Sequence, residues 1–316
     1  MRRAKADPGM IRLAVRVRRA EAEIVLAELL ELAPSGVEES ELDGGLVEFA
    51  VYGSPGELPD LPEVRAAAGQ ALVEVSSSVL DEDWSERWKR FHKPVLIDSP
   101  APGRVPAVYV RPPWELPSGR GDAAEIAIDP GRAFGTGAHA TTRLCLELLL
   151  ELTAERLDLT AERSIAVDPA TRPGGAAGRA QGSLLDMGTG SGVLAIAAAR
   201  LGYRPVWALD NDPESVRAAS ANAKANGVTI EARLFDLRRD TLRGARVPVV
   251  LANLLGPLQL DLASAIERPP QHLVAGGLLR EEVDEVAQAF AQSAGLRERE
   301  RRHSGEWAAV WLHDCA

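Results

Sequence analysis

The sequence predicts an α/β protein in which a Rossmann-like, doubly wound sheet, closed by an antiparallel hairpin, follows a small α+β unit of the ferredoxin-like kind. Three observations lead to this class. From about residue 120 onward, short apolar runs alternate with segments of helical spacing, which is typical of a largely parallel sheet. A glycine-rich turn joins one apolar run to a helix-forming segment within residues 183–200. Two final strand-like segments, separated by Ser304-Gly305, predict the closing hairpin.

Residues 1–80 show the element order of a ferredoxin-like domain. Alternating apolar residues over 11–17 predict a strand, and helical spacing over 20–32 predicts a helix. The hairpin signal Asp43-Gly44-Gly45 separates two further strands, and a second helix and a fourth strand follow within 61–76. The resulting order β-α-β-β-α-β is that of the ferredoxin-like fold.

Residues 81–110 are predicted to form a linker whose helix carries Trp84 and Trp88, and residues 111–316 a second domain. We expect the linker helix to pack its aromatic side chains against a neighbouring domain. Within the second domain, residues 159–182 are rich in Ala, Gly and Pro and show little periodicity, which predicts a mobile loop.

Composition limits the class of protein. With 46% apolar and 26% charged residues among 316, the chain has the composition of a soluble globular protein, and no apolar run approaches the roughly 20 residues that span a membrane. The net charge of −10 argues against broad binding to nucleic acid, and the basic residues crowded into positions 2–19 predict a solvated arm in preference to an RNA contact. Cys145 and Cys315 are too few for a disulfide framework or a thiolate metal site. We expect a cytoplasmic monomer without membrane contact or metal.

The glycine-rich turn Asp186-Met187-Gly188-Thr189-Gly190-Ser191-Gly192 predicts a nucleoside cofactor. Glycine lets backbone and ligand approach closely where any side chain would intrude. Asp210 follows about twenty positions later, at the end of the next apolar run, where its carboxylate can accept hydrogen bonds from ribose hydroxyls. The spacing G-x-G-x-G differs from the dinucleotide fingerprint G-x-G-x-x-G, because Val193 stands where the third glycine belongs. The G-x-G-x-G turn resembles motif I of the class I S-adenosylmethionine-dependent methyltransferases, and an NAD-dependent oxidoreductase or a structural turn remain the alternatives.

A second motif, at residues 129–142, precedes a helix expected over 143–150. This motif reads D-P-G-x-A-F-G-T-G-x-H-x-T-T, and it is followed along the chain by D-x-G-T-G-S-G, D-N-D-P and A-N-L-L. Together these motifs resemble those of the ribosomal protein L-eleven methyltransferase family, a class I S-adenosylmethionine-dependent group. The segments D-W-x-x-x-W at Asp83, P-x-W-E at Pro112 and G-E-W at Gly305 match the family as well. The resemblance covers about residues 80–316.

This resemblance implies S-adenosyl-L-methionine as cofactor, with contacts at Thr142, Gly188, Asp210 and Asn253. Thr142 would bond the methionine part, Gly188 would lie against it through its backbone, and Asp210 would hold the ribose. Asn253 would sit beside the transferring methyl as the catalytic residue. Further residues that would line the same pocket are Phe134, Thr136, His139, Gly190 and Asp236. For Asp236, a bond to the adenine amino group and a solvated position at a strand end are both open.

The implied reaction methylates lysine side chains, and the N-terminal amine as a further target, of ribosomal protein L-eleven, with the N-terminal unit docking the substrate during a transient ribosome contact. Positioning carries most of the rate of such an in-line attack. The amine must first lose its proton, since lysine has a pKa near ~10.4. The Asn253 amide suits the task of orienting its lone pair, and His139 is expected to pack and hydrogen-bond in preference to acting as a general base. Two alternatives are the same chemistry on another protein or small amine, and a noncatalytic ribosome-associated module.

Overall fold

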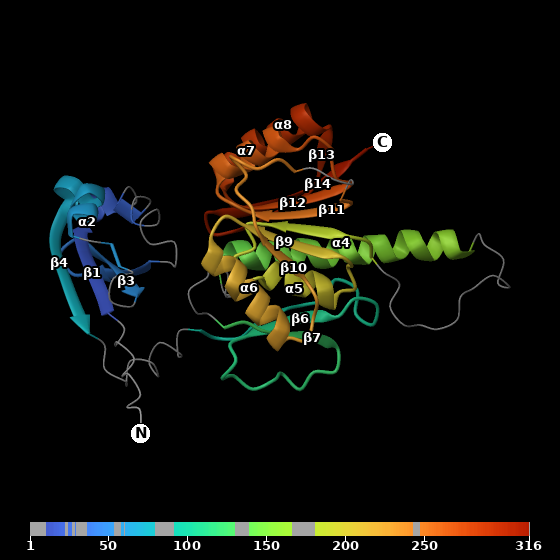
Figure 1. The fold of residues 1–316 in the computed structure, drawn as a ribbon, viewed down its shortest axis with the longest axis horizontal. Helices are drawn as coiled ribbons and strands as arrows, with labels where there is room; N and C mark the ends of the chain where they lie inside the picture. Colours follow the sequence, from blue (N-terminus) through green and yellow to red (C-terminus); the bar gives the residue numbers. More distant parts are fainter. Residues whose placement is uncertain are drawn as a thin grey trace, which may run out of the picture. The chain divides into compact units, whose positions relative to one another are not determined.

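A computed structural model describes residues 11–22, 25, 26, 29, 37–53, 58, 59, 61–79, 92–129, 139–165, 181–242 and 247–315. The chain divides into two compact units, Met1–Phe91 and His92–Ala316 (Figure 1). No helix within these described residues is both long enough and apolar enough to cross a membrane.

The first unit has the predicted ferredoxin-like sheet. Its antiparallel strands lie in the order β2-β3-β1-β4, with bounds β1 Ile11–Arg18, β2 Glu38–Leu42, β3 Leu46–Gly53 and β4 Leu72–Val79. The helix α2, Leu61–Ala68, joins β3 to β4. Val64 of α2 is fully buried in one apolar cluster with Val15 and Phe49, so the helix covers one face of the sheet. The helix expected over 20–32 lies largely outside the described residues.

Two basic residues of β1, Arg12 and Arg16, are paired with carboxylates, and this corrects the expectation of an arm for that part of the chain. Arg12 and Arg16 both contact Glu48 of β3, and Arg16 also reaches Glu74 of β4 at 2.5 Å. These pairs lie between neighbouring strands on one face, where cross-strand opposite charges stabilise a sheet. Positions 2–5 lie outside the described residues.

The second unit is built on a seven-stranded sheet in the order β10-β9-β8-β11-β12-β14-β13. Its strands are β8 Leu184–Met187, β9 Val206–Asp210, β10 Glu231–Leu234, β11 Val249–Asn253, β12 His272–Leu279, β13 Leu296–Ser304 and β14 Trp307–Asp314. All pairs are parallel except β12–β14 and β13–β14, which form the predicted closing hairpin. The chain runs from β8 outward to β10 and then returns to β11 on the other side of β8. Ligands bind at such a switch point, beyond the carboxyl ends of the strands.

Helices cover both faces of this sheet, as a doubly wound fold requires. They are α4 Ala140–Ile165, α5 Val193–Arg200, α6 Pro213–Ala225, α7 Gly256–Ala265 and α8 Val283–Ala294. Leu184 of β8 packs into the cluster formed with α4 and α5, whereas its neighbour Leu185 packs into the cluster with α7 and α8. The predicted fold class is therefore confirmed.

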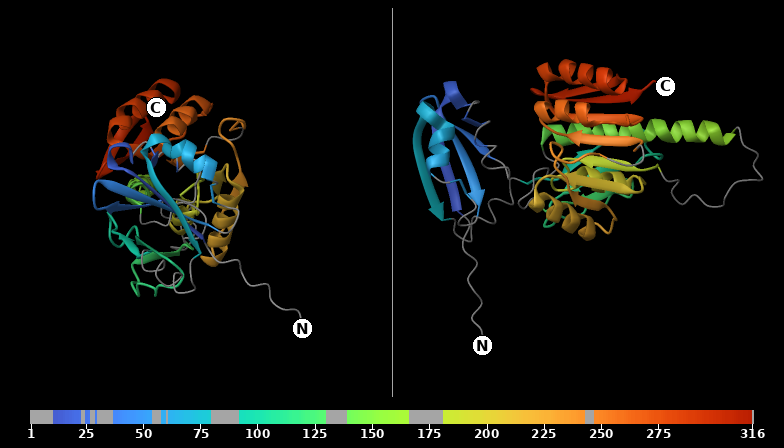
Figure 2. Two further views of the ribbon diagram at one scale, coloured as in Figure 1. Left: turned by 90° about the vertical axis from the view of Figure 1, so that its left-hand side faces the viewer. Right: turned by 45° about the horizontal axis from the view of Figure 1, so that its top comes forward.

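Two segments differ from the sequence-based prediction. The helix α4 extends to Ile165, past the expected end at 150 and into the expected loop (Figure 2), because the Ala, Glu, Arg and Leu residues that follow 150 favour helix. The other difference is the place of residues 92–110 in the fold. They contain β5 Val95–Ile97 and β6 Ala107–Arg111, which form a separate three-stranded sheet with β7 Ala123–Ala127 in the order β5-β6-β7. Ile97 and Val108 are buried in the same core as α4, so residues 92–110 belong to the second unit and not to a linker.

His272, at the start of β12, is a neutral, partly buried histidine. Trp311 of β14 donates from Nε1 to His272 Nδ1 at 3.3 Å, and the ring centroids are 5.7 Å apart. Burial, and after it the charges of Arg156 and His313, lower the pKa of His272 to about 4.

We predict that His272 makes the fold acid-sensitive. Its folded pKa of about 4 lies below the ordinary 6.5, so the unfolded chain takes up this proton first as the pH falls, and stability is lost between pH 6.5 and 4. His272→Gln keeps a side-chain acceptor but does not titrate, so urea unfolding should show a smaller loss of stability from pH 7 to pH 5 than in the unmodified chain. Equal losses in both proteins would contradict the assignment.

Candidate functional site

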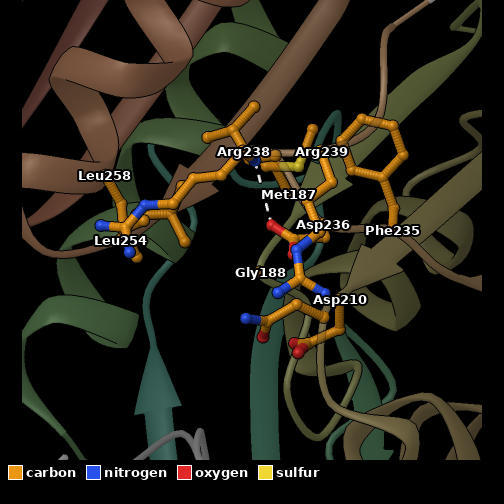
Figure 3. A pocket seen from close by; sticks show the side chains of 11 residues that line it. Met187, Gly188, Asp210, Phe235, Asp236, Arg238, Arg239, Leu254 and Leu258 are labelled. Atoms are coloured by element: carbon orange, nitrogen blue, oxygen red, sulfur yellow. Dashed lines mark hydrogen bonds and ion pairs between the residues drawn. The ribbon is translucent and has the colours of Figure 1, made fainter.

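A cavity of about 230 Å³ opens at the carboxyl edge of the seven-stranded sheet (Figure 3). It is lined by Met187, Gly188, Asp210, Asn211, Phe235, Asp236, Leu237, Arg238, Arg239, Leu254 and Leu258. These residues follow β8, β9, β10 and β11, so the cavity lies at the switch point between β8 and β11. Three of the predicted site residues, Gly188, Asp210 and Asp236, are on its wall.

The glycine turn requires glycine for two different reasons. Gly188, Gly190 and Gly192 all adopt a left-handed backbone, with φ of +71°, +51° and +83°. A Cβ on Gly188 would collide with Leu254 Cδ2 at the cavity wall, so a side chain there would narrow the cavity. A Cβ on Gly192 would lie 3.0 Å from Ala219 of α6, so that glycine permits the close approach of a helix.

Asp210 is held in place by backbone donors from two segments. Gly190 N–H donates to Asp210 Oδ2 at 2.8 Å, and Asp212 N–H donates to Asp210 Oδ1 at 3.0 Å. Burial raises the pKa of this carboxyl group, and the two N–H donors act against that rise by favouring the charged form. The side chain faces the cavity, where a carboxylate can accept further bonds from a pair of hydroxyls (Figure 3).

Asn253 and Thr142 are brought together from distant parts of the chain. Asn253 ends β11, Thr142 lies in the first turn of α4, and Asn253 Nδ2 donates to Thr142 Oγ1 at 3.5 Å. Thr142 is fully buried. Neither residue is on the wall of the cavity described above; Leu254, the next residue along the chain, is. The predicted residues therefore form two groups, one around Asp210 and one around Asn253.

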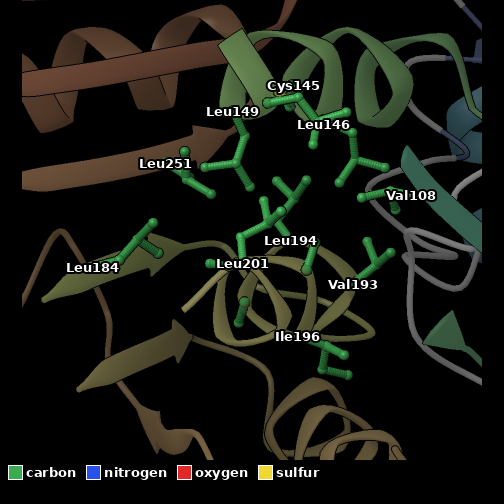
Figure 4. Close-up of a cluster of buried hydrophobic side chains, with 14 of the residues drawn as sticks. Val108, Cys145, Leu146, Leu149, Leu184, Val193, Leu194, Ile196, Leu201 and Leu251 are labelled. Atoms are coloured by element: carbon green, nitrogen blue, oxygen red, sulfur yellow. The ribbon is translucent and has the colours of Figure 1, made fainter. Parts of the chain in front are cut away.

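Gln259 supports the strand end that carries Asn253, and the sequence analysis missed it. Its side chain is fully buried, and its Nε2 donates to Ala252 O at 2.7 Å and to Gly276 O at 2.9 Å. Gly276 must lack a side chain because a Cβ would collide with Cys145 Sγ and lie 3.2 Å from Asn253 Oδ1. Cys145 itself points from α4 into the apolar core (Figure 4), and burial raises the pKa of its thiol. In the sequence, Gln259 could have been noticed as the one side-chain amide in the apolar helix that follows A-N-L-L.

Asp186 is a second functional residue that received no role from the sequence. It is fully buried at the start of the turn, and its Oδ2 accepts from Thr189 Oγ1 at 2.6 Å and from Ala195 N–H of α5 at 3.1 Å. Its Oδ1 is buried without a hydrogen-bond donor in the described structure. Burial raises the pKa of Asp186 to about 7. In the sequence, Asp186 could have been noticed as the first residue of the motif D-x-G-T-G-S-G.

The remaining predicted residues have different outcomes. His139 Nδ1 lies 2.9 Å from Thr141 Oγ1, and its ring meets that of Trp307 edge-on with 5.2 Å between the ring centroids. Burial lowers the pKa of His139. These features suit a packing and hydrogen-bonding histidine. Asp236 accepts from Arg238 N–H at 3.0 Å and pairs with Arg239, so its carboxylate is held by its own loop at the cavity wall. Phe134 and Thr136 lie outside the described residues. Among the described residues, no group of three His, Cys, Asp or Glu side chains could hold a metal.

We predict that Gln259→Leu destabilises the second unit by about 1–3 kcal/mol, because two buried hydrogen bonds are lost, although Gly276 O keeps the one from Leu254 N–H. Ser264→Ala on the same helix removes only an exposed bond to Leu260 O and should change stability by less than about 0.5 kcal/mol. Urea unfolding measures both variants. A Gln259→Leu protein as stable as Ser264→Ala would show that this amide does not hold the ends of β11 and β12.

Comparison with known proteins gives one consistent result. The model of the family "Ribosomal protein L11 methyltransferase (PrmA)" matches residues 60–314. The ribosomal protein L11 methyltransferase of Pelotomaculum thermopropionicum is 34% identical over 249 residues, which are 78% of this chain and 70% of that protein. That of Pelobacter propionicus is 38% identical over 239 residues, 75% of this chain and 68% of that protein. A solved ribosomal protein L11 methylase from Lactobacillus delbrueckii subsp. bulgaricus is 28% identical with a TM-score of 0.49, covering 69% of this chain and 98% of that one.

Proposed function

The chain belongs to the ribosomal protein L11 methyltransferase family, and from this premise we propose that it transfers a methyl group from S-adenosyl-L-methionine to ribosomal protein L11. The observation that carries the proposal is the family match over residues 60–314, which includes every strand of the seven-stranded sheet. The resemblance stated from the motifs is thereby confirmed. The glycine turn, Asp210 and the cavity at the switch point supply the geometry that such a cofactor needs.

The residues around the cavity fit this cofactor. Asp210 would accept the ribose hydroxyls, and the turn at Gly188 and Gly190 would lie against the amino-acid part, where a Cβ on Gly188 would intrude. Asp186 does not line the cavity and would act through the turn, which its carboxylate holds by bonds from Thr189 and Ala195. Asp236 on the cavity wall would face the adenine. When bound, the cofactor supplies an electrophilic methyl on a sulfonium.

Asn253 would act on the target amine. Its Nδ2 is engaged by Thr142, which leaves the amide oxygen to accept a hydrogen bond from the amine N–H and to direct the lone pair in line with the methyl. The amine must be neutral, and since lysine has a pKa near ~10.4, its proton passes to water before attack. Cys145 takes no part, because its thiol is fully buried and its pKa is raised.

The targets are lysine side chains of L11 and, as a further target, its N-terminal amine. Residues 1–80 would recognise L11, and the segment that follows them would let this domain reorient over the catalytic unit. The protein would act as a monomer in the cytoplasm, where ribosomal proteins are made, with a transient contact to the ribosome. The separate apolar core of the first unit supports its treatment as a domain in its own right.

We predict that the purified chain incorporates labelled methyl from S-adenosylmethionine into L11, and that Asn253→Ala lowers kcat by about 100-fold through loss of amine orientation. Binding of S-adenosylhomocysteine, measured by calorimetry, should weaken far less than kcat falls, with Ser264→Ala as the control variant. Preference for NAD over S-adenosylhomocysteine, or an Asn253→Ala variant with normal turnover, would overturn the proposal.

We also predict that removal of residues 1–80 abolishes methylation of L11 and leaves S-adenosylhomocysteine binding unchanged, because the described cavity residues all lie in the second unit. Mass spectrometry of L11 after incubation reads the first effect and calorimetry the second. Continued methylation of L11 by the shortened chain would show that the first unit does not dock the substrate.

A further inference from the structure

Two side chains, Asn222 of α6 and Asn226 at the C-terminal cap of the same helix, satisfy the free edge of a strand. β7 is the last strand of its sheet, and Ile128 N–H bonds inward to Arg111 O of β6, so the N–H groups of Ala127 and Asp129 point outward. Ala127 N–H donates to Asn226 Oδ1 at 2.8 Å, and Asn226 Nδ2 donates back to Ala127 O at 2.7 Å. The amide thus pairs with Ala127 as a residue of a neighbouring strand would.

Asn222, one helical turn earlier, connects this edge to the glycine turn. Asp129 N–H donates to Asn222 Oδ1 at 3.1 Å, and Asn222 Nδ2 donates to Ser191 O at 2.9 Å. Asn226 Nδ2 also donates to Asn222 O at 2.8 Å, so the two asparagines are fixed to each other. Only 5% of Asn222 and 7% of Asn226 is exposed, so water does not replace these bonds easily.

The same helix is tied to the turn at two further points. Gly192 approaches Ala219 so closely that a Cβ would lie 3.0 Å away, and Asp212, which caps α6, donates its N–H to Asp210 Oδ1. Ser191 stands between Gly190, whose N–H holds Asp210 Oδ2, and Gly192. A displacement of the Ser191 carbonyl therefore moves the donor that holds the Asp210 carboxylate.

We propose that Asn222 is a positioning residue for cofactor binding: its one amide joins Asp129, the first residue of the D-P-G motif, to Ser191 in the glycine turn. Asn226 bonds Ala127 of β7 and Asn222 O, and its side chain does not reach the glycine turn. This inference rests on the proposed use of S-adenosylmethionine, because it concerns the same turn. The two asparagines are about equally buried and both bond the end of β7. They differ in one respect: Asn222 also bonds the glycine turn, and Asn226 does not.

The test compares three variants of the full chain, each of which loses a buried hydrogen bond: Asn222→Ala, Asn226→Ala and Thr153→Val. Thr153 is 2% exposed on α4, where its Oγ1 donates to Leu149 O at 2.7 Å and lies 3.1 Å from Tyr203 OH, so it controls for general destabilisation. All three should lower Tm. Only Asn222→Ala should raise the Kd for S-adenosylhomocysteine, by about tenfold, the effect of losing one buried hydrogen bond near the ligand.

Steady-state kinetics supply a readout that general destabilisation does not move. In Asn222→Ala the KM for S-adenosylmethionine should rise while kcat at saturating cofactor stays near that of the unmodified chain, since Asn253 is untouched. Should Asn222→Ala fail to fold, Asn222→Ser, which is polar but too short to reach both partners, is measured in its place with the same expectation.

Three outcomes would overturn the proposal. They are an unchanged Kd in the folded Asn222 variant, an equal rise in Asn226→Ala or Thr153→Val, and a fall in kcat without a rise in KM. An unmodified chain that binds no S-adenosylhomocysteine would remove the proposed function itself and this inference with it. Normal binding by the unmodified chain and by Asn222→Ala alike would remove this inference alone.

Discussion

The carboxylate of Asp210 accepts one hydrogen bond from an N–H of the glycine turn and one from an N–H at the start of α6. The shape of the carboxyl edge of the sheet depends on this pair of hydrogen bonds. The parallel pairing of β8 with β9 brings Asp210 beside the turn, and Gly188 N–H extends that pairing with a bond to Leu209 O at 2.8 Å. Because both donors are backbone groups, the carboxylate stays fixed without a cationic partner. It can then present its remaining lone pairs to a ligand.

Charge in this region favours a cation. Asp186 and Asp210 lie close enough that the charge of Asp210 contributes to the raised pKa of Asp186, and burial raises the pKa of both carboxyl groups. A positively charged group bound beside Asp210 would favour the charged form of its carboxylate. The sulfonium and the ammonium of S-adenosylmethionine are groups of this kind.

Sequence periodicity and local motifs were sufficient for the element order, the glycine turn and Asp210, because each depends on residues close together in the chain. The pairing of the three-stranded sheet was not predictable in the same way, since β5 has only three residues and its partners are set by tertiary packing. Gln259 and Asn222 were missed for a related reason. Their importance comes from backbone groups of distant segments, such as Gly276 O and Asp129 N–H, and a single sequence does not show which carbonyl an amide will meet. Thr142 and Asn253 were found only through the family resemblance, and the structure places them in contact.

The most direct test of the cofactor site is a crystal structure of the full chain with S-adenosylhomocysteine. The geometry predicts the ribose hydroxyls within hydrogen-bond distance of Asp210, the adenine toward Asp236, and the sulfur beside Asn253. A ligand bound outside the cavity that Gly188, Asp210 and Leu254 line would contradict the central claim that the glycine turn and Asp210 hold the nucleoside.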